Sequence, residues 1–332
     1  MIFWSSFRRC NTLSFVHRNS NPVNTMRSIL LPHYGGAAAA QVADVPTPVA
    51  GPGQVLVRVR AAGINPLDWK VREGHVRDAF PLALPAVLGI ELAGVVAAVG
   101  PGATRFNVGD RVMGPLGGLG AYADFVAVDE TRLARTPAGL GDVEAAALPV
   151  ATLAAWQSLN LLGPVGPATR VLVHGAGGAV GGFAVQFARQ AGAFVAATAS
   201  ADDLDEIRSL GADVAVDYRT QRFEDHVADI DLVLAYAGGD VVDRSWAVLR
   251  RTGALVGTFS PEFLARTPAG RQAHWFVMKP DAARLETLAS DVASGALKSR
   301  IGEVVAFADI PAAIERSRVG PRRGKAVADF TR

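Results

Sequence analysis

The chain has 332 residues, of which 50% are hydrophobic and 35 are glycine, with a formal net charge of +2. This length exceeds one ordinary hydrophobic core and predicts two domains. Residues 1–25 contain three arginines and no acid, which leaves a body that is close to neutral. The charge pattern therefore excludes a nucleic-acid surface, and no apolar run is long enough to span a membrane.

Residues 1–25 form an acid-free leader that contains arginine and serine, as a mitochondrial presequence does. The segment after it, MRSILLPHYGG from Met26, reads as a natural beginning of the fold, so we favour a start assigned too far upstream. A cytoplasmic location is then expected, and a mitochondrial one if the leader is a genuine presequence. The one cysteine, Cys10, excludes an internal disulfide and a thiolate-rich metal site.

Residues 26–145 are predicted to be rich in β-strands. Hydrophobic and polar residues nearly alternate over residues 55–60, which is typical of a half-buried strand. Similar short segments, separated by Gly/Pro clusters, occur at residues 91–99, 110–113 and 122–128. Many short strands with glycine-rich turns favour a barrel or a small sandwich.

A helix is expected over residues 142–161, and Pro149 can divide it in two. From Arg170 strands and helices alternate, which predicts an α/β Rossmann fold with a doubly wound parallel sheet. The expected strands are residues 171–173, 194–197, 214–216, 232–234 and 255–256, and the expected helices are 180–190 and 204–210. A helix and a terminal strand, 325–330, follow Asp281.

A glycine-rich loop leaves the predicted strand 171–173 and enters the helix after it. Glycines there allow a pyrophosphate to approach the backbone, and the helix N-terminus offers N–H donors and a positive dipole end. The strand before the loop and the βα units after it favour a dinucleotide site over an ordinary turn. The candidate cofactor-binding residues are Gly175, Ala176, Gly177, Gly178, Ala179, Val180 and Gly181.

The end of the next strand favours NADPH over NADH as the cofactor. NAD-binding proteins usually place an acid there for the ribose 2′-hydroxyl, whereas this strand ends in Ala-Thr-Ala and Ser200. Asp202 and Asp203 follow closely, and we interpret them as acids at a helix start. Tyr218 and Arg219, after the third strand, are candidates for binding the 2′-phosphate, although Arg219 can equally be a solvated loop charge.

Five segments, read in order, carry a resemblance to a known family: GPGQVLVRV (51–59), AAGINPLDWK (61–70), LGIELAGVV (88–96), VGDRV (108–112) and AALP (146–149). From Met26 almost to Arg332 the chain resembles the zinc-free quinone oxidoreductases, the zeta-crystallin-like branch of the medium-chain dehydrogenase/reductase superfamily. The resemblance implies a GroES-like catalytic domain (26–145, with a return over 286–332) around a Rossmann domain (146–285), and a homodimer.

Zinc-dependent relatives have a cysteine near the position of Asn65 and a histidine where this chain has Ile90, before Glu91. Catalytic zinc needs about three protein ligands, so we expect no metal here. The expected substrate is then a small electrophile that accepts hydride readily: a quinone or an α,β-unsaturated carbonyl (an enone).

The resemblance places Asn65 beside the nicotinamide, where its amide could donate to a developing oxyanion; a turn asparagine before Pro66 is the alternative. Asp68 is expected to fix this loop through a hydrogen bond to the backbone or to Lys70. His75 stands where similar sequences commonly have tyrosine, so it is a candidate proton donor, although such a loop histidine is more often merely exposed.

Three other side chains are candidates for the site. The threonine that relatives carry near the cofactor is Ala154 here, and Thr152 is its possible replacement. Trp69 and Tyr122 could line an apolar substrate pocket, although core packing explains them equally well.

Two other functions fit the sequence. The first is an enoyl thioester or alkene reductase of the same fold, although the tyrosine donor of such enzymes has no counterpart between Asn65 and Gly120. The second is a non-catalytic NADPH-binding redox sensor or structural protein. The apolar stretch 274–278 is either a dimer edge strand or part of the core of one subunit.

Overall fold

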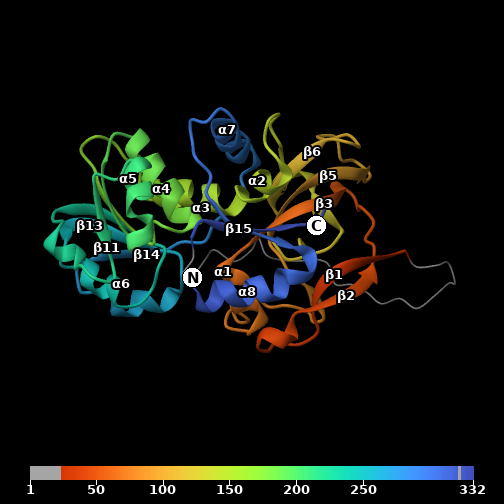
Figure 1. Cartoon of the computed structure of the whole chain (residues 1–332), viewed down its shortest axis with the longest axis horizontal. Coiled ribbons are helices and arrows are strands. Elements are labelled where there is room, and N and C mark those ends of the chain that lie inside the picture. Colours follow the sequence, from red (N-terminus) through yellow and green to blue (C-terminus); the bar gives the residue numbers. More distant parts are fainter. Residues whose placement is uncertain (1–23, 321–322) are drawn as a thin grey trace.

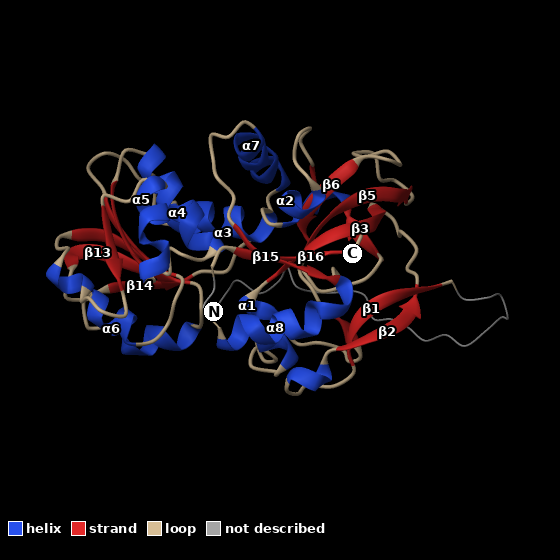
Figure 2. Cartoon of the chain, viewed as in Figure 1, coloured by secondary structure: helices blue, strands red, loops and turns tan. Residues whose placement is uncertain are grey.

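Two large β-sheets organise the described part of the chain, residues 24–320 and 323–332 of a computed structural model (Figure 1). One sheet has seven strands and belongs to the half that contains both β1 and β16, while the other has six and belongs to the opposite half (Figure 2). Most of the predicted leader, with Cys10, lies outside the described residues. The two-sheet arrangement confirms the predicted fold class.

The seven-stranded sheet is mostly antiparallel and forms the GroES-like half. Its order is β15 (Ile301–Ala306), β16 (Lys325–Asp329), β3 (Gln54–Ile64), β5 (Glu91–Val99), β6 (Arg111–Pro115) and β8 (Ala134–Arg135), with β7 (Phe125–Asp129) also paired to β3. A smaller sheet of β2 (Gln41–Pro46), β1 (Thr25–Leu31) and β4 (Ala86–Val87) flanks it. The alternation of hydrophobic and polar residues correctly predicts β3, because Val55, Val57 and Val59 are buried while Arg58 and Arg60 are exposed.

One predicted strand begins later than expected. β7 starts at Phe125 rather than at Tyr122. The backbone N–H of Tyr122 donates to Leu88 O, and its carbonyl accepts from the N–H of Ile29. These bonds hold Tyr122 in a connecting segment between sheets, outside the β3–β7 ladder.

The six-stranded sheet is parallel throughout. Its order is β11 (Val214–Asp217), β10 (Phe194–Ala199), β9 (Arg170–His174), β12 (Ile230–Ala235), β13 (Leu249–Gly257) and β14 (Gln272–Trp275). The strand order reverses between β9 and β12, which is the Rossmann arrangement and marks where ligands of this fold bind. The predicted strand at residues 255–256 is the end of the longer β13, whose first half is polar and exposed.

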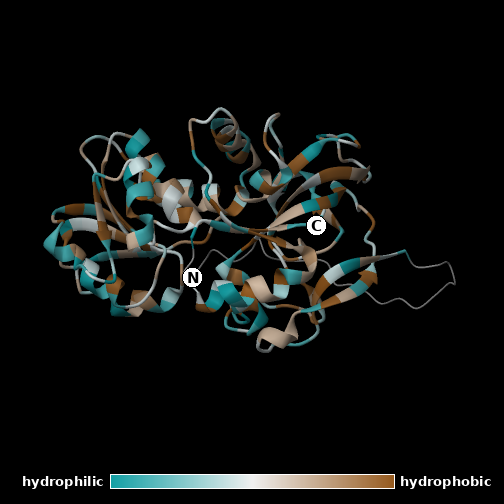
Figure 3. Cartoon of the chain, viewed as in Figure 1, coloured by the Kyte–Doolittle hydropathy of each residue, from teal (hydrophilic) through white to brown (hydrophobic). Residues whose placement is uncertain are grey.

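Helices cover both faces of this parallel sheet. α3 (Pro149–Leu159), α4 (Ala179–Gln190), α5 (Leu204–Ser209) and α7 (Ala282–Ala293) contribute to one core cluster, while α6 (Asp240–Ser245) contributes to another. The predicted helix 142–161 is divided into α2 (Asp142–Ala146) and α3, and Pro149 occupies the first turn of α3, where its missing N–H costs nothing. Figure 3 shows mixed hydrophilic and hydrophobic colours along α7, whose buried side chains recur at helical spacing.

The chain returns to the first sheet after the Rossmann half. β16 pairs antiparallel with β3, so that Ala328 lies opposite Ala62, and α8 (Ile310–Val319) packs against α1 (Pro66–Arg72). Segments from both ends of the described chain therefore build one sheet. In the described residues no helix is long and apolar enough to cross a membrane.

Candidate active site

The glycine-rich loop lies at the carboxyl end of β9, beside the reversal of strand order. Gly175 has a φ of +77°, and a Cβ on Gly181 would lie 2.7 Å from the Cα of Ala176. Ala179 and Val180 form the first turn of α4, which begins directly after Gly178. The loop geometry therefore fits a pyrophosphate held by backbone N–H groups at a helix N-terminus.

Asp202 and Asp203 stand at a helix start, as predicted: both belong to the short 3-10 helix before α5, and Asp203 directly precedes α5. The side chain of Asp203 caps no helix N–H and has other partners. Its carboxylate lies 2.5 Å from an Arg300 nitrogen and 2.9 Å from Arg323 Nε, and Ser200 Oγ donates to it at 2.6 Å. Burial opposes its ionisation, but the hydrogen bonds from Arg300 and Ser200 outweigh burial and lower its pKa. The sequence missed both arginines because they come from the return segment, about a hundred residues later.

Tyr218 and Arg219 lie together after β11, as predicted. Arg219 Nε donates to the Tyr218 hydroxyl at 3.3 Å, and the Tyr218 side chain is half exposed. One surface groove is lined by both residues together with Arg222 and Arg244. Ser200, which is also a candidate cofactor-binding residue from the sequence, directs its hydroxyl to Asp203.

Asn65 immediately precedes α1 and is almost completely buried. Its Nδ2 donates to Gly63 O at 3.1 Å and to Glu91 Oε1 at 2.8 Å. Its Oδ1 accepts from Lys325 Nζ at 2.6 Å. The amide predicted to contact an oxyanion thus already uses two donors and one acceptor within the protein.

Lys325 is a site residue that sequence reasoning missed. Its ammonium lies 2.5 Å from Glu91 Oε1, and both side chains are buried. The second oxygen of Glu91 accepts from the backbone N–H of Val150 at 2.7 Å. A Cβ on Gly63 would lie 2.8 Å from Lys325 Cε, so glycine there leaves room for the pair. No local pattern marks Lys325, since β16 reaches Glu91 only through the sheet.

Asp68 closes a capping box with Asn65 and is completely buried. Its Oδ2 accepts from the Asn65 backbone N–H at 2.6 Å and from the Tyr122 hydroxyl at 2.7 Å. The backbone bond was predicted, but the side-chain partner is Tyr122, not Lys70. Burial raises the pKa of Asp68 to about 7.

Tyr122 belongs to the core and does not line a pocket. Its side chain has no exposed surface, and its hydroxyl also reaches Gly63 O at 3.1 Å. Burial and the neighbouring Asp68 raise its pKa well above the ordinary value. Thr152 is also buried and donates to Leu148 O inside α3 at 2.8 Å, so its hydroxyl is committed to the helix.

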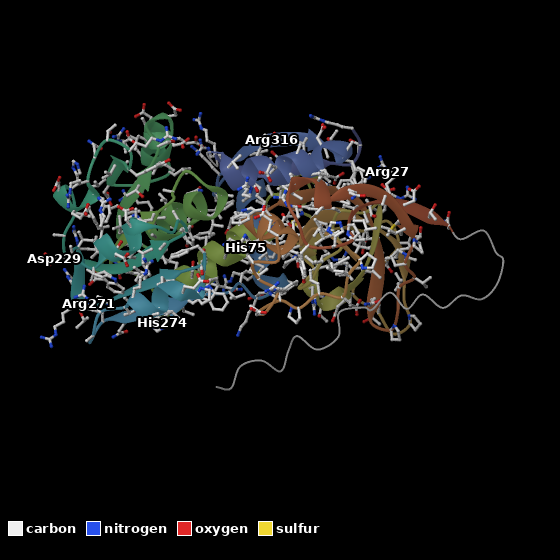
Figure 4. All side chains as sticks on the ribbon, turned by 90° about the horizontal axis from the view of Figure 1, so that it is seen from below. Arg27, His75, Asp229, Arg271, His274 and Arg316 are labelled. Atoms are coloured by element: carbon white, nitrogen blue, oxygen red, sulfur yellow. The ribbon has the colours of Figure 1, made fainter. Side chains whose placement is uncertain are left out.

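His75 lies at the junction between the two halves, where Figure 4 shows it between His274 and Arg27. Its side chain is 59% exposed, and its Nε2 lies 3.1 Å from Glu73 Oε2. Its ring meets the edge of Trp69 at 5.7 Å between centroids. The structure thus places His75 near the junction but pairs it with a surface carboxylate.

Lys70 joins the two halves directly. Its Nζ donates to the backbone carbonyl of Phe259 at 2.5 Å, between α1 and the loop that follows β13. Lys70 Nζ also lies 5.7 Å from the ring centroid of Trp69. This contact between the halves was not predicted from the sequence.

The residues at the expected zinc position do not fit a metal. Ile90 has no donor atom, Asn65 is hydrogen-bonded on both sides of its amide, and Glu91 is paired with an ammonium. In the described part of the chain no three His, Cys, Asp or Glu side chains gather where they could hold a metal ion. A divalent cation beside Glu91 would also be repelled by Lys325.

Comparisons with known proteins agree with this architecture. Residues 51–138 match the family "Alcohol dehydrogenase GroES-like domain", and residues 210–327 match "Zinc-binding dehydrogenase". A chloroplast envelope quinone oxidoreductase homolog of Arabidopsis thaliana is 38% identical over 193 residues, which are 56% of this chain and 59% of that protein. The chain thus spans about three fifths of this plant relative.

Solved structures resemble the whole fold. The quinone oxidoreductase of Coxiella burnetii has a TM-score of 0.86 and 29% identity, covering 92% of this chain and 100% of that one. An alcohol dehydrogenase superfamily protein of Novosphingobium aromaticivorans has a TM-score of 0.79 and 32% identity, with the same coverage. The chain belongs to the medium-chain dehydrogenase/reductase superfamily, among its quinone oxidoreductase-like members.

Proposed function

We propose that this protein is an NADPH-dependent oxidoreductase that delivers hydride to a quinone or an α,β-unsaturated carbonyl without a metal. The observation that carries the proposal is the glycine loop at the strand-order reversal. The carbonyl of Gly177 in this loop accepts from the backbone N–H of Gly324, which directly precedes β16 in the half that holds Asn65. When bound there, the dihydronicotinamide supplies the hydride. The chain's own residues hold the cofactor, orient the acceptor and manage the charge that develops on it.

The choice of NADPH rests on the charges around β10 and β11. Asp203, an acid that follows β10 closely, is paired with Arg300 and Arg323, whose charges offset its repulsion of a 2′-phosphate. After β11, Tyr218 offers a hydroxyl donor and Arg219 and Arg222 offer guanidinium donors, and all three line one groove. Guanidinium groups suit phosphate recognition because they donate paired hydrogen bonds.

Metal independence rests on Lys325. Its ammonium supplies a fixed positive charge to Glu91, the carboxylate next to the expected zinc position. Without a Lewis acid, the acceptor has to be electrophilic on its own, as quinones and enones are. We therefore expect chelation to leave the activity unchanged.

The proposal is tested by following nicotinamide absorbance with purified protein. The acceptors are 1,4-benzoquinone, 9,10-phenanthrenequinone, an alkenal and crotonyl-CoA, each with NADPH, with NADH and after chelator treatment. Turnover of quinones or enones that prefers NADPH and survives chelation is the expected result. Activity lost on chelation would contradict metal independence.

The two alternatives give different outcomes in the same assay. Activity confined to crotonyl-CoA would indicate an enoyl thioester reductase. Tight NADPH binding without turnover of any acceptor would indicate a redox sensor or structural protein. The buried hydroxyl of Tyr122, already donated to Asp68, weighs against a tyrosine proton donor at this position.

We further propose that the protein is a homodimer joined through β14. This strand is the edge of the parallel sheet and pairs on one side with β13. An edge strand presents unpaired backbone groups to a second copy. The predicted stretch 274–278 begins within β14: His274 and Trp275 belong to this edge strand, whereas Phe276 is buried in the core of the Rossmann half.

A further inference from the structure

We propose that Arg323 sets the cofactor specificity of this protein by binding the 2′-phosphate of NADPH. The proposal deepens the proposed function and rests on it. Arg323 comes directly before Gly324 and β16, so it belongs to the return segment of the GroES-like half and not to the Rossmann half. The half that holds Asn65 thus supplies the residue that distinguishes NADPH from NADH.

The return segment lies directly against the glycine loop. The carbonyl of Gly177 accepts from the backbone N–H of Gly324 at 2.8 Å and from Arg300 Nη1 at 2.9 Å. Gly178 and Gly324 also form a parallel β-bridge. Arg323 is therefore held next to the loop whose geometry fits a pyrophosphate.

The side chain of Arg323 is directed to the tip of β10. Its Nε donates to Asp203 Oδ1 at 2.9 Å, and its Nη2 donates to the backbone carbonyl of Asp202 at 3.0 Å. Both acids follow Ser200, at the carboxyl end of this strand. In Rossmann folds this end of the second strand receives the ribose that carries the 2′-hydroxyl of NAD or the 2′-phosphate of NADP. The guanidinium of Arg323 thus lies where the two cofactors differ.

The two hydrogen bonds of Arg323 engage one edge of its guanidinium. The group carries several N–H donors in one fixed plane, of which Nε and one N–H of Nη2 are used. Among the described residues, no acceptor is bound by Nη1. The side chain is 49% exposed, so a phosphate can reach the edge formed by Nη1 and Nη2. Two parallel N–H donors match two phosphate oxygens.

Asp203 acts in this arrangement as a positioning residue. In NAD-binding Rossmann folds an acid near this place binds the ribose 2′-hydroxyl. Here the carboxylate is almost completely buried, and its oxygens accept from Arg300, Arg323 and Ser200. The hydrogen bonds from Arg300 and Ser200 lower the pKa of Asp203 against the opposing effect of burial. The carboxylate therefore stays ionised and fixes the orientation of the Arg323 guanidinium.

Arg219 flanks the same tip from the side of β11. The backbone N–H of Tyr218 donates to Ala199 O at 3.1 Å, which holds this segment beside the end of β10. Arg219 Nε donates to the half-exposed hydroxyl of Tyr218 at 3.3 Å, whereas Arg323 is fixed by a buried carboxylate and a backbone carbonyl. A guanidinium that is already oriented loses less conformational entropy when it binds phosphate. Arg323 is thus the better prepared of the two arginines.

The test uses two nucleotides that differ only in the 2′-phosphate, 2′,5′-ADP and 5′-AMP, each titrated into the full chain by calorimetry. The wild-type protein should bind 2′,5′-ADP more tightly, and R323M should lower this preference by about tenfold or more. R323K keeps the charge but not the paired donors, so its preference should lie between the two. A change in folding alone leaves the ratio of the two affinities unchanged, because it affects both nucleotides equally.

The matched control is R316M. The side chains of Arg316 and Arg323 are each 49% exposed, and each is paired with a carboxylate, that of Glu303 or that of Asp203. Arg316 lies on α8 (Figure 4), away from the glycine loop. R316M removes the same charge and should keep the wild-type preference for 2′,5′-ADP.

Turnover of a quinone gives a second readout. R323M should lower kcat/KM with NADPH by about the factor seen for 2′,5′-ADP, chiefly through KM, and leave kcat/KM with NADH unchanged. A preference for 2′,5′-ADP that R323M retains, or that R316M loses equally, would overturn the role of Arg323. A wild-type protein that binds both nucleotides equally would refute the NADPH dependence of the proposed function. Absence of turnover together with an Arg323-dependent preference would refute hydride transfer alone and support the role of Arg323.

Discussion

Asp68 is the residue whose protonation the fold controls most directly. It is completely buried, and burial raises its pKa to about 7, against an unfolded value of about 3.9. Tyr122 donates to it, while Glu91 and Lys325 act on it from β5 and β16. The folded protein therefore keeps a proton on Asp68 over a pH range in which the unfolded chain has released it.

This difference makes stability fall with rising pH. Between about pH 4 and pH 7 the folded state holds a proton that the unfolded chain has released, so the free energy of unfolding decreases as the pH rises. This decrease is complete above pH 7. Asp68→Asn does not titrate, and its Oδ1 can accept both existing hydrogen bonds. Between pH 5 and pH 8 the free energy of unfolding of the wild type should therefore fall by about 2–4 kcal/mol relative to that of D68N, measured by urea unfolding.

The matched control for this prediction is D78N, because the Asp78 side chain is fully exposed. Its unfolding free energy should follow that of the wild type at both pH values. Parallel pH dependences of D68N and wild type would contradict a neutral Asp68 in the folded protein.

At the scale of elements, the glycine loop serves two needs that can be separated. A Cβ on Gly181 would press on the Ala176 backbone within the loop, whereas one on Gly178 would meet only Gly175 O, at 3.5 Å. Gly181 is thus needed for the loop to fold against α4. Gly178 leaves open the side from which a pyrophosphate approaches.

We expect G181A to cost about 1–3 kcal/mol of stability, seen as a lowered Tm in the protein without cofactor. G178A should keep the Tm of the wild type but weaken NADPH binding by about tenfold or more, measured by fluorescence titration. Equal effects of the two substitutions on Tm would show that the glycines are not divided in this way.

How far the sequence predicts these elements depends on the range of the forces involved. β3, β5, α4 and the glycine loop follow from alternation, helix propensity and turn residues within short windows. The pairing of Asp203 with Arg300, and of Glu91 with Lys325, depends on a chain path that brings distant segments together. No local pattern records such a pairing, so the site's charges were predicted less well than its backbone.

At the scale of the whole molecule, β14 decides the proposed assembly. Phe276 N donates to Gly257 O, toward β13, so by strand alternation the N–H of Ala273 points outward. Ala273→Pro removes this outward donor and should convert a dimer into a monomer, measured by light scattering during size-exclusion chromatography. A wild-type monomer, or a dimeric A273P, would contradict pairing through β14.

The cytoplasmic location stays a prediction.

The pairing of Lys325 with Glu91 has a consequence for the order of folding. The two residues are 234 positions apart, and the whole Rossmann half lies between them. A carboxylate at the position of Glu91 is costly to bury until its cation arrives, so the GroES-like half cannot complete its core on its own residues before then. The Rossmann half is continuous in sequence, and its sheet contains no strand of the other half. Its buried Asp203 still needs Arg300 and Arg323 of the return segment, but the six parallel strands pair without them. The Rossmann sheet should therefore form first and, by bringing β16 back to β3, act as the template on which the other half closes.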